Sequence, residues 1–151
     1  MKELSFTVFQ IPTGKATVHH TKSGIAYHTK EQRFNADSLM TEMIQYRPPE
    51  PITDPIILEV QIYFPVPDSK PAWWREAALA GFIQHDKKPD DDNCRKQIAD
   101  CLEKLQFVKN DSQIFYGIQK KQYSNNPRWE IKIRIVPNIT REEWKEGKDT
   151  Y

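Results

Sequence analysis

The chain has 151 residues and a formal net charge of +1, which fits one compact domain. Apolar residues make up 38% and charged residues 28%, as in ordinary globular proteins. No apolar run approaches the ~18 residues needed to span a bilayer, and the N-terminus lacks a signal peptide, so we expect a cytoplasmic protein without membrane association. A pI of about 7.8 argues against a protein that coats nucleic acid nonspecifically.

The first half of the chain predicts a strand, a hairpin, a helix and a second strand. Alternation of apolar and polar residues predicts strands over residues 4–9 and, more clearly, 56–64. Turn residues around Lys22-Ser23-Gly24 indicate a hairpin. Thr29 and Gln32 have the spacing of a capping box, and Pro48 ends the helix that follows. Its apolar side is predicted to consist of Phe34, Ala36, Leu39, Met40, Met43 and Ile44.

The second half predicts a short helix over residues 73–82, a longer one over about 92–105, and strands over 114–122 and 128–136. Cys94 and Cys101 lie seven residues apart, not in a C-x-x-C pair, and are interpreted as buried thiols on one helix face. Strands on either side of two main helices indicate an α+β fold with a mixed or antiparallel sheet. We expect one domain over residues 1–136 and a polar tail over 137–151, with a short helix capped by Thr140.

Three successive carboxylates, Asp90, Asp91 and Asp92, stand where the longer helix begins. Converging carboxylates repel one another unless a cation is present, and hard oxygen ligands favour Mg²⁺ or Mn²⁺. In an extended entry to the helix, Asp90 and Asp92 can face one side while Asp91 faces away. Lys96, one turn after Asp92, can reach a phosphate on the same ion. The same spacing also fits an ordinary acidic helix start with an Asp92–Lys96 ion pair, and Asp111 fits a turn residue.

The acidic segment resembles the signature of RusA-type Holliday junction resolvases. That signature reads Lys/Arg-Pro-Asp-any-Asp-Asn, a lysine four residues after the second aspartate, Asp-Ala-Leu, and then Asp-Asp-Ala/Ser-Gln. The matching residues here are Lys88-Pro89-Asp90-Asp91-Asp92-Asn93, Lys96, Asp100-Cys101-Leu102 and Asn110-Asp111-Ser112-Gln113. The resemblance covers residues 3–136 and includes phage and prophage members. Asp91 occupies a variable position, where we expect a solvated side chain, and Asn110 replaces a frequent acid.

The resemblance implies that Asp90, Asp92 and Asp111 form a metal site and that Lys96 is the catalytic lysine. Members of the family are dimeric, depend on Mg²⁺ and cut four-way DNA junctions symmetrically. From the ligand chemistry we expect Mn²⁺ to be able to substitute for Mg²⁺. We therefore expect a homodimeric, structure-specific endodeoxyribonuclease that resolves branched DNA in recombination and repair. Phe6, Phe9 and the tryptophans are the first candidates for the dimer interface.

DNA affinity must come from positive side chains that meet phosphates. The candidates are Lys15, Lys87, Lys88, Arg95, Lys120, Lys121, Lys132 and Arg134. Three alternatives stay open: an inactive protein that binds branched DNA, a metal-dependent nucleotide phosphohydrolase, and an interaction domain with a solvated acidic helix cap. Only a protein that binds branched DNA should show an affinity for it that falls with salt.

Overall fold

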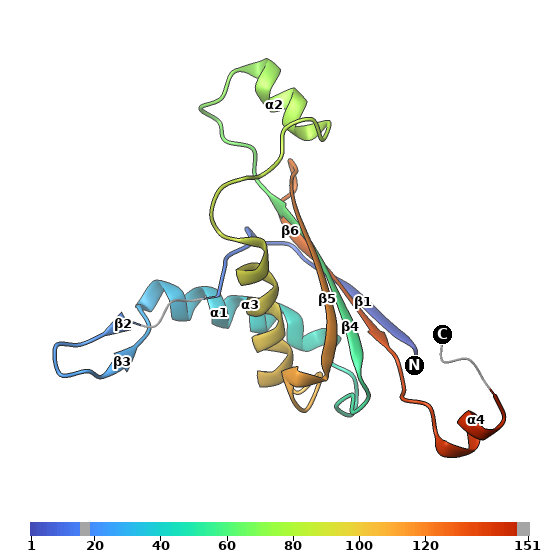
Figure 1. Ribbon diagram of the computed structural model, residues 1–151. Helices are drawn as coiled ribbons and strands as arrows, with labels where there is room; N and C mark the ends of the chain where they lie inside the picture. The colour runs from blue at the N-terminus through green and yellow to red at the C-terminus, as the bar shows by residue number, and fades with distance from the viewer. Residues whose placement is uncertain (16–18, 148–151) are drawn as a thin grey trace.

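The computed structural model describes residues 1–15 and 19–147 and has a four-stranded mixed sheet at its centre (Figure 1). The strand order is β1-β6-β4-β5, so β1 and β5 are the edges. The strands are β1 (Glu3–Val8), β4 (Ile56–Phe64), β5 (Ile114–Tyr123) and β6 (Arg128–Ile135). β6 is antiparallel to β1 and β4, whereas β4 and β5 are parallel. The predicted α+β class, the mixed sheet and these four strands are confirmed.

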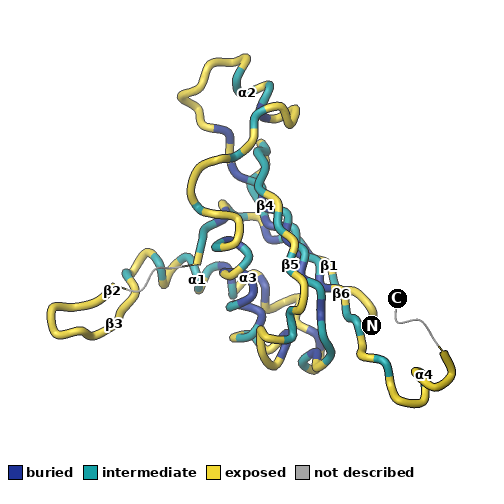
Figure 2. The backbone as a smooth tube through the Cα atoms, in the orientation of Figure 1, coloured by how far each residue is buried: buried dark blue, intermediate teal, exposed yellow. Residues whose placement is uncertain are grey.

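Two helices, α1 (Lys30–Met43) and α3 (Asp91–Lys104), cover one face of the sheet (Figures 1 and 2). The alternation of β4 places Leu58, Val60 and Ile62 on this face, where they are fully buried with Ile98 and Leu102 of α3. Each such buried side chain stabilises the fold by about 1.5–3 kcal/mol. The opposite side of the sheet is only partly buried. We call it the open face; it carries Glu59, Tyr116, Ile118, Lys120, Lys132 and Arg134.

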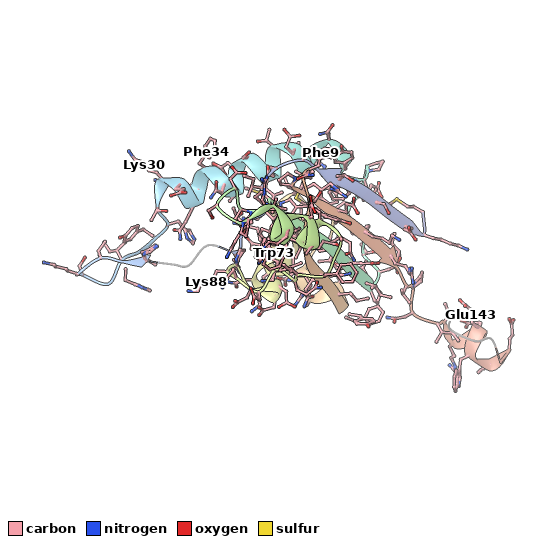
Figure 3. The ribbon with its side chains drawn as sticks, turned by 90° about the horizontal axis from the view of Figure 1, so that it is seen from above. Phe9, Lys30, Phe34, Trp73, Lys88 and Glu143 are labelled. Atoms are coloured by element: carbon pink, nitrogen blue, oxygen red, sulfur yellow. The ribbon has the colours of Figure 1, made fainter. Side chains whose placement is uncertain are left out.

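The helix α1 begins at the predicted capping box, in which the Thr29 hydroxyl accepts from the backbone N–H of Gln32 at 3.2 Å. Leu39 and Met43 are buried as predicted, but Phe34 is 71% exposed and Ile44 is also exposed. The first half of α1 projects past the sheet toward the hairpin of β2 (His19–His20) and β3 (Ala26–Tyr27) (Figures 1 and 3). The predictions for Phe34 and Ile44 were therefore wrong. No sheet lies beneath the first half of the helix, and Ile44 lies beyond its end, in the short 3-10 helix η1 (Ile44–Tyr46).

The remaining elements lie at the periphery (Figure 1). The predicted short helix is α2 (Ala72–Leu79), whose Trp74 packs edge-on against Tyr123 while Trp73 is exposed. The tail helix α4 (Arg141–Lys145) is capped by Thr140, and residues 148–151 of the predicted tail lie outside the described residues. Phe6 is buried in the core, so it was a wrong candidate for a dimer interface. No helix in the described ranges is long and apolar enough to cross a membrane.

Candidate active site

Asp90 is the N-cap residue of α3, but its carboxylate does not cap the helix. Its backbone carbonyl accepts the N–H of Cys94 at 3.0 Å, as an N-cap carbonyl should. An aspartate in this position usually accepts a second hydrogen bond through its side chain. The Asp90 side chain instead lies at the edge of a cleft, exposed to solvent. Its carboxylate is thus available to an external ligand.

Asp91 is not the plain solvated side chain that its variable position led us to expect. Its Oδ2 accepts a hydrogen bond at 3.0 Å from the amide of Gln119 on β5, and its Oδ1 accepts from the N–H of Asp92. The hydrogen bond from Gln119 is the main cause that lowers the pKa of the Asp91 carboxyl. Asp91 therefore attaches the first turn of α3 to the sheet, which corrects the expectation from its variable position.

Asp92 and Lys96 lie on the solvent side of the same helix, and their charged atoms are 3.5 Å apart. Both side chains are about half exposed, at 52% and 53%. An exposed pair of this kind contributes less than about 1 kcal/mol to stability, because water screens it and ordering two long side chains costs entropy. The pair is held near Asp90 by the helix backbone, so its position does not depend on the ion pair itself.

A cleft of about 500 Å³ opens beside Asp90, between the segment Pro12–Lys15, α1 and the start of α3. The backbone N–H of Lys15 donates to the carbonyl of Asn93 at 3.0 Å and closes one wall. Gly14 is needed there, since a Cβ would lie 2.8 Å from Cβ of Pro89. Gln97 is only 5% exposed, lines the cleft and makes no hydrogen bond to any described residue. The cleft has the volume of a small-ligand site and offers an amide with unused hydrogen-bonding capacity.

Asp111 lies at the other end of α3. It opens the short 3-10 helix η2 (Asp111–Gln113), and its backbone N–H donates to Oε1 of Glu103 at 3.0 Å. The 13 residues from Asp90 to Glu103 correspond to about 20 Å of helix. In a single copy of the chain, Asp90, Asp92 and Lys96 therefore lie within the first turns of α3, whereas Asp111 lies at its far end.

Among the described residues, no three His, Cys, Asp or Glu side chains come close enough to hold one metal ion. Asp90 and Asp92 still offer hard oxygen ligands, with an ammonium group beside them. That donor set fits Mg²⁺ or Mn²⁺ and does not suit soft metals, because the two cysteines of α3 are buried on its other side. Burial raises the pKa of the Cys94 and Cys101 thiols to about 12, so both remain neutral.

Comparison with known proteins places this chain among its relatives. A family model described as "Endodeoxyribonuclease RusA" matches residues 9–134. The chain belongs to the RusA endodeoxyribonuclease family. It is 25% identical over 138 residues to the crossover junction endodeoxyribonuclease rusA of Lactococcus phage r1t, covering 89% of this chain and 98% of that protein. It is 38% identical over 94 residues to the uncharacterized protein YqaN of Bacillus subtilis (strain 168), covering 61% of this chain and 66% of that protein.

In this RusA family member, the predicted basic residues form two groups on opposite sides of the sheet. Lys15 and Lys88 line the cleft, and Lys87 precedes it. Lys121 supports the loop, because its ammonium donates to the carbonyls of Lys87 at 2.6 Å and Pro89 at 3.0 Å. The open face carries the second group, Lys120, Lys132 and Arg134, away from α3 as predicted for the last two.

Arg95 and Gln119 connect α3 to β5. The Nε of Arg95 donates to Oε1 of Gln119 at 3.1 Å, and the Arg95 side chain lies over Gly117, where a Cβ would approach it to 2.8 Å. Sequence reasoning missed Gln119, because its place depends on the parallel register of β5 with β4. In that register Gln119 and Lys121 lie beside the buried Val60 and Ile62, so they are polar on the side of the sheet that α3 covers.

Gln113 belongs to the RusA signature, and the structure gives it a supporting role. Its amide nitrogen donates to the carbonyls of Ile52 at 2.8 Å and Asp54 at 3.0 Å. Its amide oxygen accepts from the backbone of Lys109 and Asn110. Because all these bonds converge on one side chain, Gln113 fixes the turn that carries Asp111. Sequence analysis quoted this residue but assigned it no role.

Proposed function

We propose that this protein is a Mg²⁺-dependent endodeoxyribonuclease that cuts four-way and other branched DNA by paired symmetric nicks in recombination and repair. One observation carries the proposal: in a RusA family member, the Asp90 carboxylate has no partner among the described residues and the Asp92 carboxylate pairs only with the half-exposed Lys96, on either side of an anchored Asp91. Clustered carboxylates beside a cleft repel DNA phosphates by themselves. They favour binding only where a cation lies between the carboxylates and the phosphate.

Asp90 and Asp92 would hold the Mg²⁺ ion. Because Asp111 lies at the far end of α3 in one copy of the chain, it would serve as the third ligand only from the second copy of the predicted homodimer. The bound ion would polarise the scissile phosphate and supply a more acidic water, with Mn²⁺ as a substitute. Lys96 would donate to a phosphate oxygen and offset the charge that develops during cleavage. Since Lys96 stands one helical turn from Asp92, no rearrangement of α3 is needed for that contact.

The DNA strand would pass along the loop before α3, where Lys87, Lys88 and Lys15 meet its phosphates. Arg95 and Lys121 would act mainly by holding the loop and helix in place, since both already donate to protein groups. The open-face residues Lys120, Lys132 and Arg134 would contact the arms of the junction. The nucleotide next to the scissile phosphate would enter the cleft, where the amide of Gln97 can hydrogen-bond its base.

An end-labelled four-way junction and a linear duplex of matched sequence test this proposal when each is incubated with the protein, with and without Mg²⁺. We expect cuts in the junction at symmetry-related positions, only in the presence of Mg²⁺ or Mn²⁺. The linear duplex should remain intact under the same conditions. A junction left uncut with either ion, or a duplex cut equally fast, would contradict the proposal.

A further inference from the structure

The segment between β4 and α3 forms a lobe beyond the sheet, at the end of the molecule where α3 begins (Figure 1). We call residues 71–88, which include α2, the α2 lobe. Two aromatic contacts attach it to the sheet. Trp74 packs edge-on against Tyr123 with ring centroids 5.6 Å apart, and His85 stacks on Phe64 at 3.9 Å. The lobe therefore has a defined position next to the loop that leads into α3.

Two further aromatic side chains of the lobe remain exposed, Trp73 at 67% and Phe82 at 84% (Figure 3). Trp73 lies one helical turn before Ala77. Gly81, with a φ of 84°, ends the helix, and the N–H of Phe82 then donates to the carbonyl of Ala77 at 2.9 Å. The backbone thus places Trp73 and Phe82 on either side of Ala77. We call this pair the aromatic platform.

We infer that the aromatic platform stacks against an unpaired base at the branch point of DNA. The inference rests on the proposed function, because the DNA is the same substrate. In a linear duplex each base is stacked between its two neighbours, whereas a branch point exposes bases that lack a neighbour. Only an exposed base can stack on a protein ring. The platform would therefore contribute to the preference for branched over linear DNA.

The charges around the platform favour DNA over a protein partner. The ammonium group of Lys70 lies 5.0 Å from the centre of the Trp74 ring, next to Trp73 in the chain. Lys87 and Lys88 are exposed where the lobe ends. Lysine is depleted in protein–protein interfaces. Exposed rings among cations are instead typical of sites that bind unpaired nucleic acid, in which the rings stack on bases and the cations meet phosphates.

The path from the platform to the acidic residues is short and fixed. The ammonium of Lys121 binds the carbonyls of Lys87 and Pro89, directly before Asp90. Phe82 and Asp90 are eight residues apart in the chain, so at most about 29 Å separates their backbones. That span is less than one turn of duplex DNA, which is about 34 Å. The platform would thus hold the branch point at a set distance from the cut.

Binding measured without Mg²⁺ tests the inference independently of cleavage. Trp73→Leu keeps an apolar side chain but removes the flat ring. We expect it to lower the affinity for a four-way junction by about 10-fold and to leave the affinity for linear duplex unchanged. Trp73→Tyr keeps a ring and should retain most of the junction affinity. Because Trp73 is exposed, both variants should fold, which their Tm values check.

Trp144→Leu is the matched control. Trp144 is 71% exposed on α4, far from the α2 lobe (Figure 1). We expect wild-type affinity for both DNAs from this variant. Fluorescence gives a second readout, since a stacked base quenches indole emission. The emission that is lost in Trp73→Leu should be quenched in the wild type by saturating junction but not by linear duplex. The emission that is lost in Trp144→Leu should be quenched by neither.

Three results would each overturn the inference. One is an equal change in junction and duplex affinity in Trp73→Leu, or no change in either. Another is a loss in Trp73→Tyr as large as that in Trp73→Leu, because apolar packing rather than stacking would then be at work. The third is a smaller oligomer of Trp73→Leu in sedimentation velocity, since a second copy of the chain would then cover the platform.

The outcomes also separate the inference from the proposed function. If the wild type cuts junctions but Trp73→Leu binds them normally, the nuclease proposal survives and the platform fails. If junction affinity depends on Trp73 but the wild type cuts no DNA with Mg²⁺ or Mn²⁺, the platform survives and the nuclease proposal fails. A wild type that binds no branched DNA overturns both.

Discussion

The side-chain amide of Gln119 donates to the carboxylate of Asp91 at 3.0 Å and joins the first turn of α3 to the edge strand β5. Arg95 donates to the same Gln119 from one turn further along α3. The middle one of three consecutive aspartates is thereby fixed to the sheet. Asp90 and Asp92 stand on either side of it, at positions set by the anchored backbone, and both remain exposed to solvent.

Replacement of Gln119 by leucine should destabilise the protein in a pH-dependent way. The folded pKa of Asp91 lies below the ordinary value of 3.8, so its contribution is fully present above pH 3.8 and is lost as the pH falls through the lowered pKa. We expect the Tm difference between wild type and Gln119→Leu, measured by calorimetry, to be constant above about pH 5 and to shrink below pH 3.8.

Gln122→Leu is the matched control for this pH dependence. Gln122 also lies on β5, and its amide donates to Gln61 at 2.8 Å on the open face. Both partners are uncharged at every pH, so any Tm difference should not vary with acid. The same acid dependence in both variants would rule out Asp91 as the cause.

Lys96→Met should lower the rate of junction cleavage by about 100-fold, because the phosphate would lose its positive partner during the reaction. Junction affinity and Tm should change little, since an exposed ion pair contributes little to stability. Single-turnover cleavage and gel shifts measure the two effects separately.

Lys104→Met is the control for Lys96, because Lys104 forms an equivalent pair with Asp100 at 3.0 Å on the same helix. The hydrogen bond with Asp100 raises the pKa of Lys104, so its side chain is a cation at neutral pH. We expect wild-type cleavage from this variant. An equal loss of rate in both variants would show that general helix charge, rather than the position of Lys96, matters.

Gln97→Met should leave the Tm nearly unchanged while it weakens cleavage. Methionine fills a similar space, and the amide that it replaces lines the cleft and makes no hydrogen bond to a described residue. In the DNA complex, however, the variant would lose a hydrogen bond to the base in the cleft. A library of junctions with varied bases at the cut should show a flatter sequence preference. An unchanged sequence preference would show that Gln97 does not recognise a base.

Lys88→Ala should reduce both junction affinity and its dependence on salt. Removal of one lysine–phosphate interaction lowers the slope of log K against log[salt] by about 1 for duplex DNA. Arg134→Ala, on the open face, should lower the slope similarly but leave the cleavage rate of bound junction unchanged, since Arg134 is far from Asp90. If Lys88→Ala has the same slope of log K against log[salt] as the wild type, Lys88 does not contact a DNA phosphate.

Much of the fold could be predicted because it depends on local patterns. The alternation of apolar and polar residues predicted β4 correctly, and the capping box at Thr29 predicted the start of α1. Phe34 could not be placed, because periodicity shows which side of a helix is apolar but not how far the sheet extends beneath it.

The predicted site depends partly on neighbours in sequence. Asp90, Asp92 and Lys96 share one short segment at the start of α3, so a local pattern was enough to propose them together. Asp111 depends on tertiary arrangement. The length of α3 was a usable signal, since a turn that directly follows a 14-residue helix lies at the far end from its N-cap. The role of Gln119 required the parallel register of β4 and β5, which no local pattern contains.

Cleavage of a labelled four-way junction by Asp90→Asn in Mg²⁺, with binding measured on the same samples, tests the central claim most directly. Asp68→Asn, an exposed aspartate on the far loop, is the control. If Asp90 is a metal ligand of a nuclease, Asp90→Asn should bind the junction with near wild-type affinity and cut it at least about 100-fold more slowly, while Asp68→Asn cuts normally. Cleavage by Asp90→Asn at the wild-type rate would contradict the account.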